Sequence, residues 1–310
     1  MASIGDSGEG AKWQTTGPVF SLLLAGTLWG AFWFPLRWLE QLGLSGLWQT
    51  FFIYTGTLWV IVLLLWQRSS TLKHELSRAP WLLLFMALAS GWCNTAFILA
   101  MLEGEVMRVL LLFYLSPLWA TLIGWLFLKE TLHRLSILVL IVAISGAVIM
   151  FWHPEMGYPW PDGTADWLAL SAGISFAILN SLVRFTHQVS IPVKTAFAWL
   201  GAIAVSLILI LMTQTGLPKV DISVIGYAML IGAAIMVIMT FSVVYGVTHM
   251  PVHRSSVILL FELVAGAVSS QLLTDEVIGT REWIGGTLVV LAAWLSAHRQ
   301  MQNVNEGIQT

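Results

Sequence analysis

The chain has 310 residues, of which 58% are hydrophobic and only 10% carry a formal charge, whereas a typical soluble domain has about 25% charged residues. This composition excludes a soluble globule and a disordered chain. The net charge of −2 leaves no basic stripe that could neutralise phosphates, which excludes a nucleic-acid-binding protein. A single cysteine, Cys93, excludes an internal disulfide and a cysteine-rich metal site. An integral membrane protein remains.

Long apolar segments follow one another along the whole chain. A helix that crosses the hydrocarbon core of a bilayer needs about 20 apolar residues. Ten segments of about this length occur, and only the ninth contains a charged residue, Glu262. We therefore expect an all-α integral membrane protein with ten transmembrane helices, short connections and no soluble domain. The predicted spans are residues 18–36, 43–66, 81–102, 109–128, 135–152, 167–183, 195–212, 222–248, 255–273 and 283–297.

The basic residues predict the orientation of the chain in the membrane. Of the 14 Lys and Arg residues, ten fall on the side of the N-terminus and four on the opposite side. Because basic residues concentrate on the cytoplasmic side, both termini are expected in the cytoplasm, and the protein is expected in the inner (plasma) membrane. The first 17 residues lack the basic region of a secretory signal, so the first span is expected to be retained.

The two halves of the chain resemble each other at an offset of 146 to 147 residues. In a chain with so few charges, three aligned pairs of charged residues indicate an internal repeat. Five helices is an odd number, so the second copy must enter the membrane upside down. Inverted repeats of this kind allow alternating access to a site near the midplane. The aligned pairs are Gly26 and Gly173, Arg37 and Arg184, Arg108 and Arg254, and Glu130 and Glu276.

The repeat divides the chain into five parts. We expect an N-terminal cytoplasmic tail at 1–17, a first five-helix repeat at 18–152 and a second at 167–297. An external linker at 153–166, which contains no Lys or Arg, joins the repeats, and a cytoplasmic tail at 298–310 follows the second.

The segment LSPLWATLIGWLFLKETLHRLSILVLIVAISGAVIM, residues 115–150, resembles the EamA-type branch of the drug/metabolite transporter superfamily. The similarity comprises the Ser-Pro pair within a helix, the glutamate that closes the helix and the glycine in the next span. The second half repeats it less perfectly as FELVAGAVSSQLLTDEVIGTREWIGGTLVVLAAW. The resemblance covers nearly the whole chain and implies ten helices in two inverted repeats. In the ninth helix the family often has a proline where this chain has Leu263, so a kink there is not assured.

Glu262 is the sharpest functional signal in the sequence because it lies about halfway along the ninth span. A charged side chain at the bilayer centre costs about 2.5–3.5 kcal/mol, so it should face protein or water. Burial disfavours the charged form of a carboxyl group, which makes proton loading and release near neutral pH physically reasonable. We interpret Glu262 as a substrate-binding or coupling carboxylate. The alternative is a protonated structural residue that is hydrogen-bonded to a neighbouring helix.

Other polar and aromatic side chains lie at a similar depth. Each polar one is alternatively explained by an interhelical hydrogen bond, and each tryptophan by packing or lipid contact. Pro117 is a candidate hinge in the fourth span, and Gly26 with Gly30 predicts close helix packing. We expect Glu130 and Glu276 at the membrane edge, and the histidines in or beside loops. The further candidates for the substrate site are Asn94, Tyr114, Ser116, Asn180, Tyr245, Trp29, Trp33 and Trp92.

The sequence contains none of the short motifs of common enzyme classes. There is no GxxxxGK[ST] phosphate loop, no HExxH and no GxSxG. We therefore predict no enzyme, no cofactor and no metal site, but a secondary transporter of a small organic metabolite. The resemblance implies export of amino acids or related compounds, and the tryptophans favour an amphipathic or aromatic one. Proton coupling and the oligomeric state stay open, as do a multidrug cation exporter, a lipid-linked flippase and a membrane scaffold.

Overall fold

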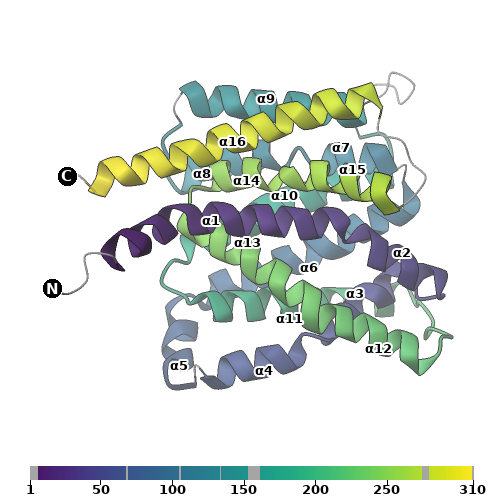
Figure 1. Ribbon diagram of the computed structural model, residues 1–310. Helices are drawn as coiled ribbons and strands as arrows, with labels where there is room; N and C mark the ends of the chain where they lie inside the picture. The colour runs from purple at the N-terminus through teal and green to yellow at the C-terminus, as the bar shows by residue number, and fades with distance from the viewer. Residues whose placement is uncertain are drawn as a thin grey trace.

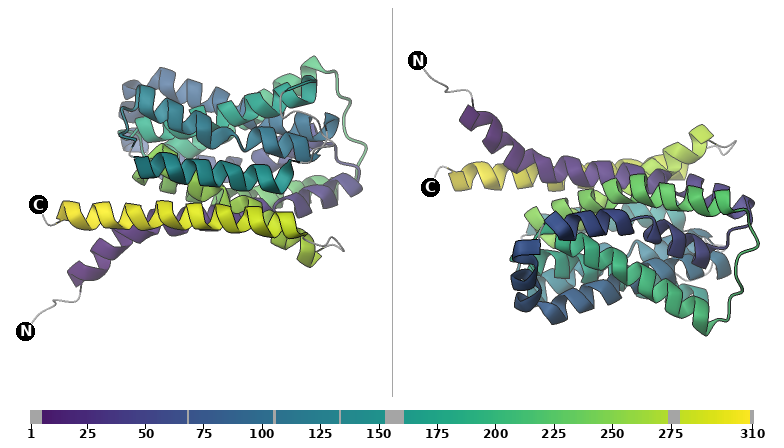
Figure 2. Two further views of the ribbon diagram at one scale, coloured as in Figure 1. Left: turned by 90° about the horizontal axis from the view of Figure 1, so that it is seen from above. Right: turned by 90° about the horizontal axis from the view of Figure 1, so that it is seen from below.

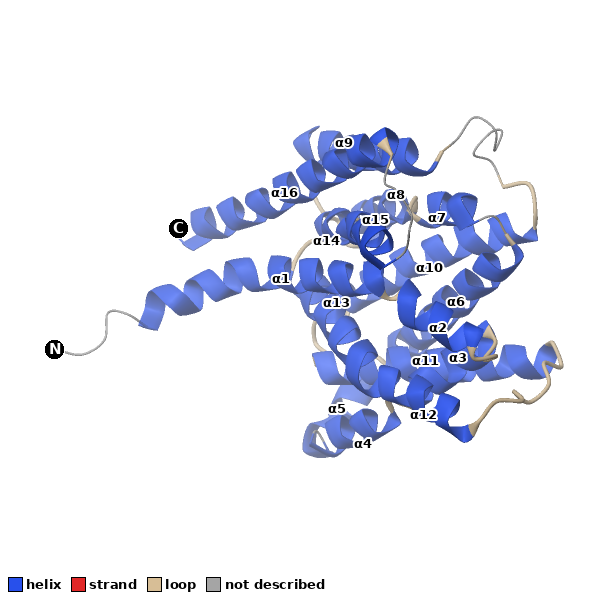
Figure 3. Cartoon of the chain, turned by 45° about the vertical axis from the view of Figure 1, so that its right-hand side comes forward, coloured by secondary structure: helices blue, strands red, loops and turns tan. Residues whose placement is uncertain are grey.

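The computed structural model describes residues 6–67, 69–104, 106–132, 134–152, 161–273 and 279–308. Within these ranges the chain consists of helices and loops, without strands (Figures 1 and 3), which confirms the predicted all-α class. The first half comprises α1 Asp6–Ala31, α2 Trp33–Gln41, α3 Gly46–Thr55, α4 Leu58–Gln67, α5 Ser69–Arg78, α6 Pro80–Glu103, α7 Val106–Phe113, α8 Ser116–Phe127 and α9 Arg134–Phe151. The second half comprises α10 Thr164–Phe185, α11 Ile191–Met212, α12 Ile222–Ile231, the π-helical turn η2 Gly232–Met236, α13 Val237–His249, α14 Val252–Leu259, α15 Phe261–Leu273 and α16 Thr280–Ile308.

Eight helical stretches in the described residues are long and apolar enough to cross a membrane, so the protein is a multi-pass membrane protein. Two shorter apolar helices, Arg134–Met150 and Trp283–Leu295, coincide with the fifth and tenth predicted spans. Ten crossings therefore stay a prediction. The long stretches are Thr16–Gln41, Gly46–Gln67, Pro80–Ala100, Arg108–Phe127, Thr164–Phe185, Ile191–Met212, Ile222–His249 and Val252–Leu273.

The outer surface of the bundle is apolar, as expected for helices surrounded by lipid. Large side chains such as Trp66, Trp81 and Trp294 are more than half exposed. In water such side chains would make an aggregation-prone patch, whereas in a bilayer they lie in their preferred solvent. The helices therefore bury one another only partly and use the membrane for the rest.

Two of the membrane-spanning stretches are broken at equivalent positions. The first break, at Tyr114 and Leu115, separates α7 from α8, and the second, at Leu260, separates α14 from α15. Both use a tight i to i−3 hydrogen bond: Leu115 N–H donates to the carbonyl of Leu112 at 3.4 Å, and Leu260 N–H to that of Val257 at 3.2 Å. The donors of these two hydrogen bonds are 145 residues apart, which is within one residue of the offset of the sequence repeat.

Proline is not required for a break of this kind. Pro117 lies in the first turn of α8, where its missing N–H costs nothing, rather than in the middle of a helix. Its counterpart Leu263 follows the second break, which forms although no proline is present. The α-helical pattern of the ninth span is therefore interrupted at Leu260, whereas a kink there stays a prediction.

Contacts between helices come in pairs that are related by exchange of the two halves. Helix α1 packs on α14 and α15 at the second break, and its counterpart α10 packs on α7 and α8 at the first. Likewise α6 packs on α11, and its counterpart α12 packs on α3. The last helices of the halves, α9 and α16, pack against each other. The start of α1 and the end of α16 project from the same end of the bundle (Figures 1 and 2).

Candidate functional site

The two helix breaks meet in the interior of the bundle. Glu262, in the first turn of α15, is partly buried, and its Oε1 accepts a hydrogen bond of 2.8 Å from the hydroxyl group of Tyr114. Tyr114 itself lies at the break between α7 and α8. The contact therefore joins the broken helix of one half to the broken helix of the other.

Helix α1 approaches Glu262 with glycines. A Cβ atom at Gly30 would lie 2.5 Å from the carbonyl oxygen of Glu262, and one at Gly26 would lie 3.2 Å from its N–H nitrogen. The prediction that these two glycines allow close helix packing is confirmed. In the other half, Gly173 of α10 approaches the first break, where a Cβ would lie 2.7 Å from the carbonyl oxygen of Phe113. Both breaks are thus covered by a glycine of the partner repeat.

The surroundings of Glu262 are largely apolar. Cys93 of α6 is buried and belongs to the same core cluster as Tyr114 and Leu263. Asn94, the next residue, makes its hydrogen bonds elsewhere: its Oδ1 accepts from the Tyr54 hydroxyl at 2.8 Å, and its Nδ2 donates to the carbonyl of Ser90. Neither of these bonds involves Glu262.

The three mid-span tryptophans have different surroundings. Trp33 donates from Nε1 to Ser269 Oγ at 2.9 Å, and Ser269 lies on α15 two turns beyond Glu262. Trp92 donates to Ser171 of α10 at 3.1 Å and is partly exposed. Trp29 is partly buried against the core clusters. Trp33 is therefore the one that the structure connects to the helix of Glu262.

The remaining candidates are distributed over several helices. Ser116, the counterpart of Glu262, is buried at the start of α8. Asn180 on α10 is buried, and its Nδ2 has no hydrogen-bond partner. Tyr245 lies near the end of α13, where its ring contacts that of His249 with 4.4 Å between centroids. These contacts do not join them to Glu262.

The sequence profile of the EamA-like transporter family matches residues 16–152 and again residues 163–297. The chain belongs to this family. Each half is thus one EamA repeat, and the family indicates a transporter rather than an enzyme. The predicted membership of the EamA-type branch is confirmed.

Two curated relatives of this EamA-like chain are bacterial. "Uncharacterized transporter YojE" of Bacillus subtilis is 28% identical over 160 residues, which cover 49% of this chain and 50% of that protein. "Uncharacterized transporter PA0485" of Pseudomonas aeruginosa is 22% identical over 183 residues, which cover 57% and 58%. The chain spans about half the length of the curated relatives it matches. A crystal structure with 16% identity superposes with a TM-score of 0.70 over 92% of this chain and 98% of the other, which shows the shared fold.

Glu130 of this EamA-like chain fastens the end of α8 to the start of α14. Its Oε1 accepts from the N–H of Val252 at 3.0 Å, and its Oε2 contacts His253 Nδ1 at 2.9 Å. Burial raises the pKa of the Glu130 carboxyl, but the bonds from His253 and Val252 outweigh it and hold that pKa below its usual range. The predicted capping or pairing role of Glu130 is confirmed, whereas Glu276 lies outside the described residues.

Sequence reasoning missed several buried charged groups. His253 lies beside a loop, as expected of the histidines, but it is buried and paired with Glu130. At the opposite end of the bundle Arg108 pairs with Asp166, which the sequence placed in the external linker. Lys194 is completely buried near the start of α11. A charge within a few residues of a predicted span was the available signal, but it does not distinguish an exposed end from a buried one.

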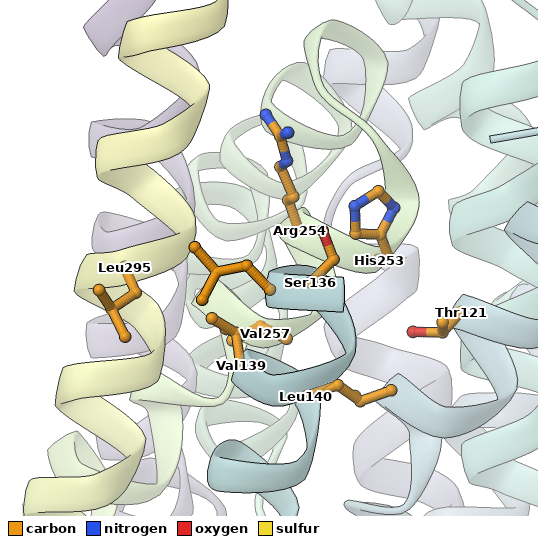
Figure 4. A pocket seen from close by; sticks show the side chains of 9 residues that line it. Thr121, Ser136, Val139, Leu140, His253, Arg254, Val257 and Leu295 are labelled. Atoms are coloured by element: carbon orange, nitrogen blue, oxygen red, sulfur yellow. The ribbon is translucent and has the colours of Figure 1, made fainter. Parts of the chain in front are cut away.

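Two cavities lie away from Glu262. A small one of about 10 Å³ between α8, α9, α14 and α16 is close to the smallest that can hold one water molecule. Figure 4 shows the side chains that line it, among them His253 and Arg254 of α14 and Ser136 of α9. A larger one of about 350 Å³ lies where α8 and α10 end. Glu262 lines neither.

Proposed function

We propose that this chain is a secondary transporter that exports a small organic metabolite by alternating access across the inner membrane. The observation that carries the proposal is the hydrogen bond between Tyr114 and Glu262, which joins the helix break of one repeat to that of the other. The substrate site would lie at this junction. Both ends of the chain would lie in the cytoplasm, as the distribution of basic residues predicts.

The architecture behind this proposal is ten crossings in two inverted five-helix repeats. Two family matches of similar length support the repeat, and the paired helix contacts support a pseudo-twofold relation between the halves. The start of α1 and the end of α16 lie at the same end of the bundle, as an even number of crossings requires. Two such halves can pack in two nearly equivalent ways, one open to each side of the membrane.

Glu262 supplies the chemistry of the proposed site. In the described arrangement its carboxylate accepts a hydrogen bond from Tyr114. A substrate ammonium group or a proton can each neutralise this carboxylate, but not both at once. Competition between the two would couple export of an amine-bearing metabolite to proton entry. The supporting features are the partly buried carboxylate of Glu262 and the apolar cluster around it.

The nearby aromatic groups favour an amphipathic or aromatic metabolite, with amino acids and related compounds as the first class to test. Trp33 is tied to the helix of Glu262 through Ser269, and the guanidinium carbon of Arg37 lies 5.4 Å from the centre of the Trp33 ring. That ring therefore already accommodates a cation on its face. The same observation favours, as the second candidate, an exporter of hydrophobic cations.

A metabolite-wide comparison of cells tests the proposal. Cells that carry the wild-type chain, the Glu262→Gln variant or no chain are compared for metabolites inside and in the medium. We expect an amine-bearing metabolite to leave the cells with the wild-type chain alone, and competition by cationic dyes would identify the second candidate. If the Glu262→Gln cells matched the wild type in every metabolite, the proposed role of Glu262 would be wrong.

A further inference from the structure

The ends of α8 and α10 flank an open cavity with a basic lining. The cavity has a volume of about 350 Å³, and Lys129, Arg184 and His187 contribute its polar side chains. Its lining residues lie where α8 and α10 end. These helix ends lie at the end of the bundle from which α1 and α16 project (Figure 1). In the proposed orientation this is the cytoplasmic side, where anionic lipid headgroups face the protein.

Two cations beside this cavity have only neutral hydrogen-bond acceptors. Arg184 Nη1 donates to the carbonyl oxygen of Thr248 at 2.5 Å. Lys194 Nζ, completely buried, donates to the carbonyl oxygen of Val183 at 2.7 Å and to Thr248 Oγ1 at 3.3 Å. Among the described residues no carboxylate forms a salt bridge with either cation. Burying a positive charge without a counter-charge is costly.

The carboxylate of Glu130 interacts electrostatically with Arg184. It does not neutralise the basic cluster formed by Arg184, Lys194 and Lys129. One of its oxygens accepts from the N–H of Val252 and the other contacts His253. Its single negative charge is therefore already shared with the start of α14, while Arg184, Lys194 and the neighbouring Lys129 together carry three positive charges. The cluster keeps an excess of positive charge that an external anion can balance.

The rim of the cavity also fits a ligand. Lys129 has a φ of 54°, which ends α8 together with the hydrogen bond of 3.0 Å from the N–H of Glu130 to the carbonyl of Gly124, and its exposed side chain lies at this rim. Two phenylalanines flank the basic groups: Phe127 is 72% exposed and Phe185 is 50% exposed. Basic groups with an adjoining apolar rim match a molecule that has an anionic head and an acyl tail.

We propose that this cavity binds a phosphate-bearing anion, the headgroup of an anionic phospholipid from the leaflet on the side of the termini. The phosphate contacts Arg184 and Lys129, and the acyl chains lie along Phe127 and Phe185. Since α8 belongs to the first repeat and α10 to the second, the bound headgroup joins the two repeats at this end. This site is separate from Glu262 and does not depend on the transported substrate.

Lipid retention tests the site. The full chain is purified from nanodiscs that contain equal amounts of phosphatidylcholine and phosphatidylglycerol, and the retained lipids are counted by native mass spectrometry. The variants are Lys129→Gln and Arg184→Gln, and the matched control is Lys73→Gln/Arg78→Gln, which removes two exposed cations from α5. We expect each cavity variant to retain about fivefold less phosphatidylglycerol, since one cation near the surface is worth about 1 kcal/mol. The control should match the wild type.

Lys129→Gln keeps the test valid if Arg184→Gln does not fold, because Lys129 is exposed. Equal phosphatidylglycerol retention by wild type, both cavity variants and control would overturn the proposal. A parallel arm adds inorganic phosphate to protein in pure phosphatidylcholine nanodiscs and measures the thermal midpoint. If phosphate raised the midpoint of the wild type but not that of Lys129→Gln, while no lipid was selectively retained, the result would support a phosphate site. It would also reject the phospholipid headgroup as its ligand.

Discussion

The two helix breaks have the same backbone geometry but opposite chemistry. In the first repeat the sequence at the break is Tyr114, Leu115, Ser116, and in the second it is Leu260, Phe261, Glu262. The first supplies a hydroxyl donor and the second the carboxylate that accepts from it. The repeat pairs Tyr114 with Leu260 and Ser116 with Glu262, so the two residues in contact are not counterparts of each other. Substitution after duplication explains why only one half carries a charge at its break.

The two breaks also differ in how closely the helix of the other repeat packs on them. On the Glu262 side α1 presents both Gly26 and Gly30, whereas on the other side α10 presents Gly173 followed by Ala177, the counterpart of Gly30. The contact of α1 with α15 is therefore the closer one. The half that carries the carboxylate is also the half whose break is most tightly covered.

The largest expected effect is that of Gly30→Ala. Its Cβ would lie 2.5 Å from the carbonyl oxygen of Glu262 and 2.6 Å from the N–H nitrogen of Gly266, and these backbone atoms cannot move independently. Overpacking of a core typically lowers the free energy of unfolding by about 1–3 kcal/mol, and we expect a loss near the upper end of this range. It would be measured as a lower thermal midpoint in detergent. Gly226→Ala is the matched control, because a Cβ there meets open space within α12. Equal midpoints for the two variants would refute the close contact.

Tyr114→Phe should come next. It removes the hydroxyl donor to Glu262 without changing the ring, and a hydrogen bond to a charged group is worth about 1.5–3 kcal/mol. We expect the apparent affinity for the exported substrate to fall by about tenfold or more in vesicles. Tyr54→Phe, which removes a buried hydroxyl bonded to Asn94 instead, serves as control. If Tyr54→Phe lowered the apparent affinity more than Tyr114→Phe, the proposed location of the substrate site at Glu262 would be wrong.

Glu130→Gln tests whether the charged carboxylate at the end of α8 stabilises the fold. Because the folded protein holds the pKa of Glu130 below its ordinary value of 4.5, the charged carboxylate stabilises the fold above that pH. This contribution is lost as the pH falls through the lowered pKa. The variant should therefore have a lower thermal midpoint than the wild type at neutral pH, and the difference should shrink in acid. A difference that grew in acid would contradict the assignment.

The smallest expected effect is that of Pro117→Leu, which copies the second break into the first. Since α14 and α15 break where Leu263 replaces proline, α7 and α8 should remain broken as well. We expect a stability change below about 1 kcal/mol, within the range of tolerated apolar replacements. Transport rates near those of the wild type would follow. A straightened fourth helix in a structure of the variant would show that proline is the cause of the first break.

The sequence was sufficient for the fold class and the repeat because charged residues are scarce in this chain. Glu262 stood out for the same reason, and Tyr114 was among the residues expected to reach it. Asn94 was expected there too, yet it bonds Tyr54, since a sequence gives the depth of a residue in a helix but not which neighbour its face meets. The break at Leu260 was uncertain because no residue type marks it, and it depends on packing against α1. Lys194 and His253 were missed because their burial depends on other helix ends that converge on them.

The pH dependence of transport by Glu262→Gln tests the central claim most directly. Wild type, Glu262→Gln and the counterpart control Ser116→Ala are reconstituted into proteoliposomes, and substrate counterflow is measured as a function of pH. We expect transport by the wild type and by Ser116→Ala to depend on pH, whereas Glu262→Gln should remain folded and be either inactive or independent of pH. An unchanged pH profile in Glu262→Gln would contradict the claim that the carboxylate at the second break binds the proton or the substrate.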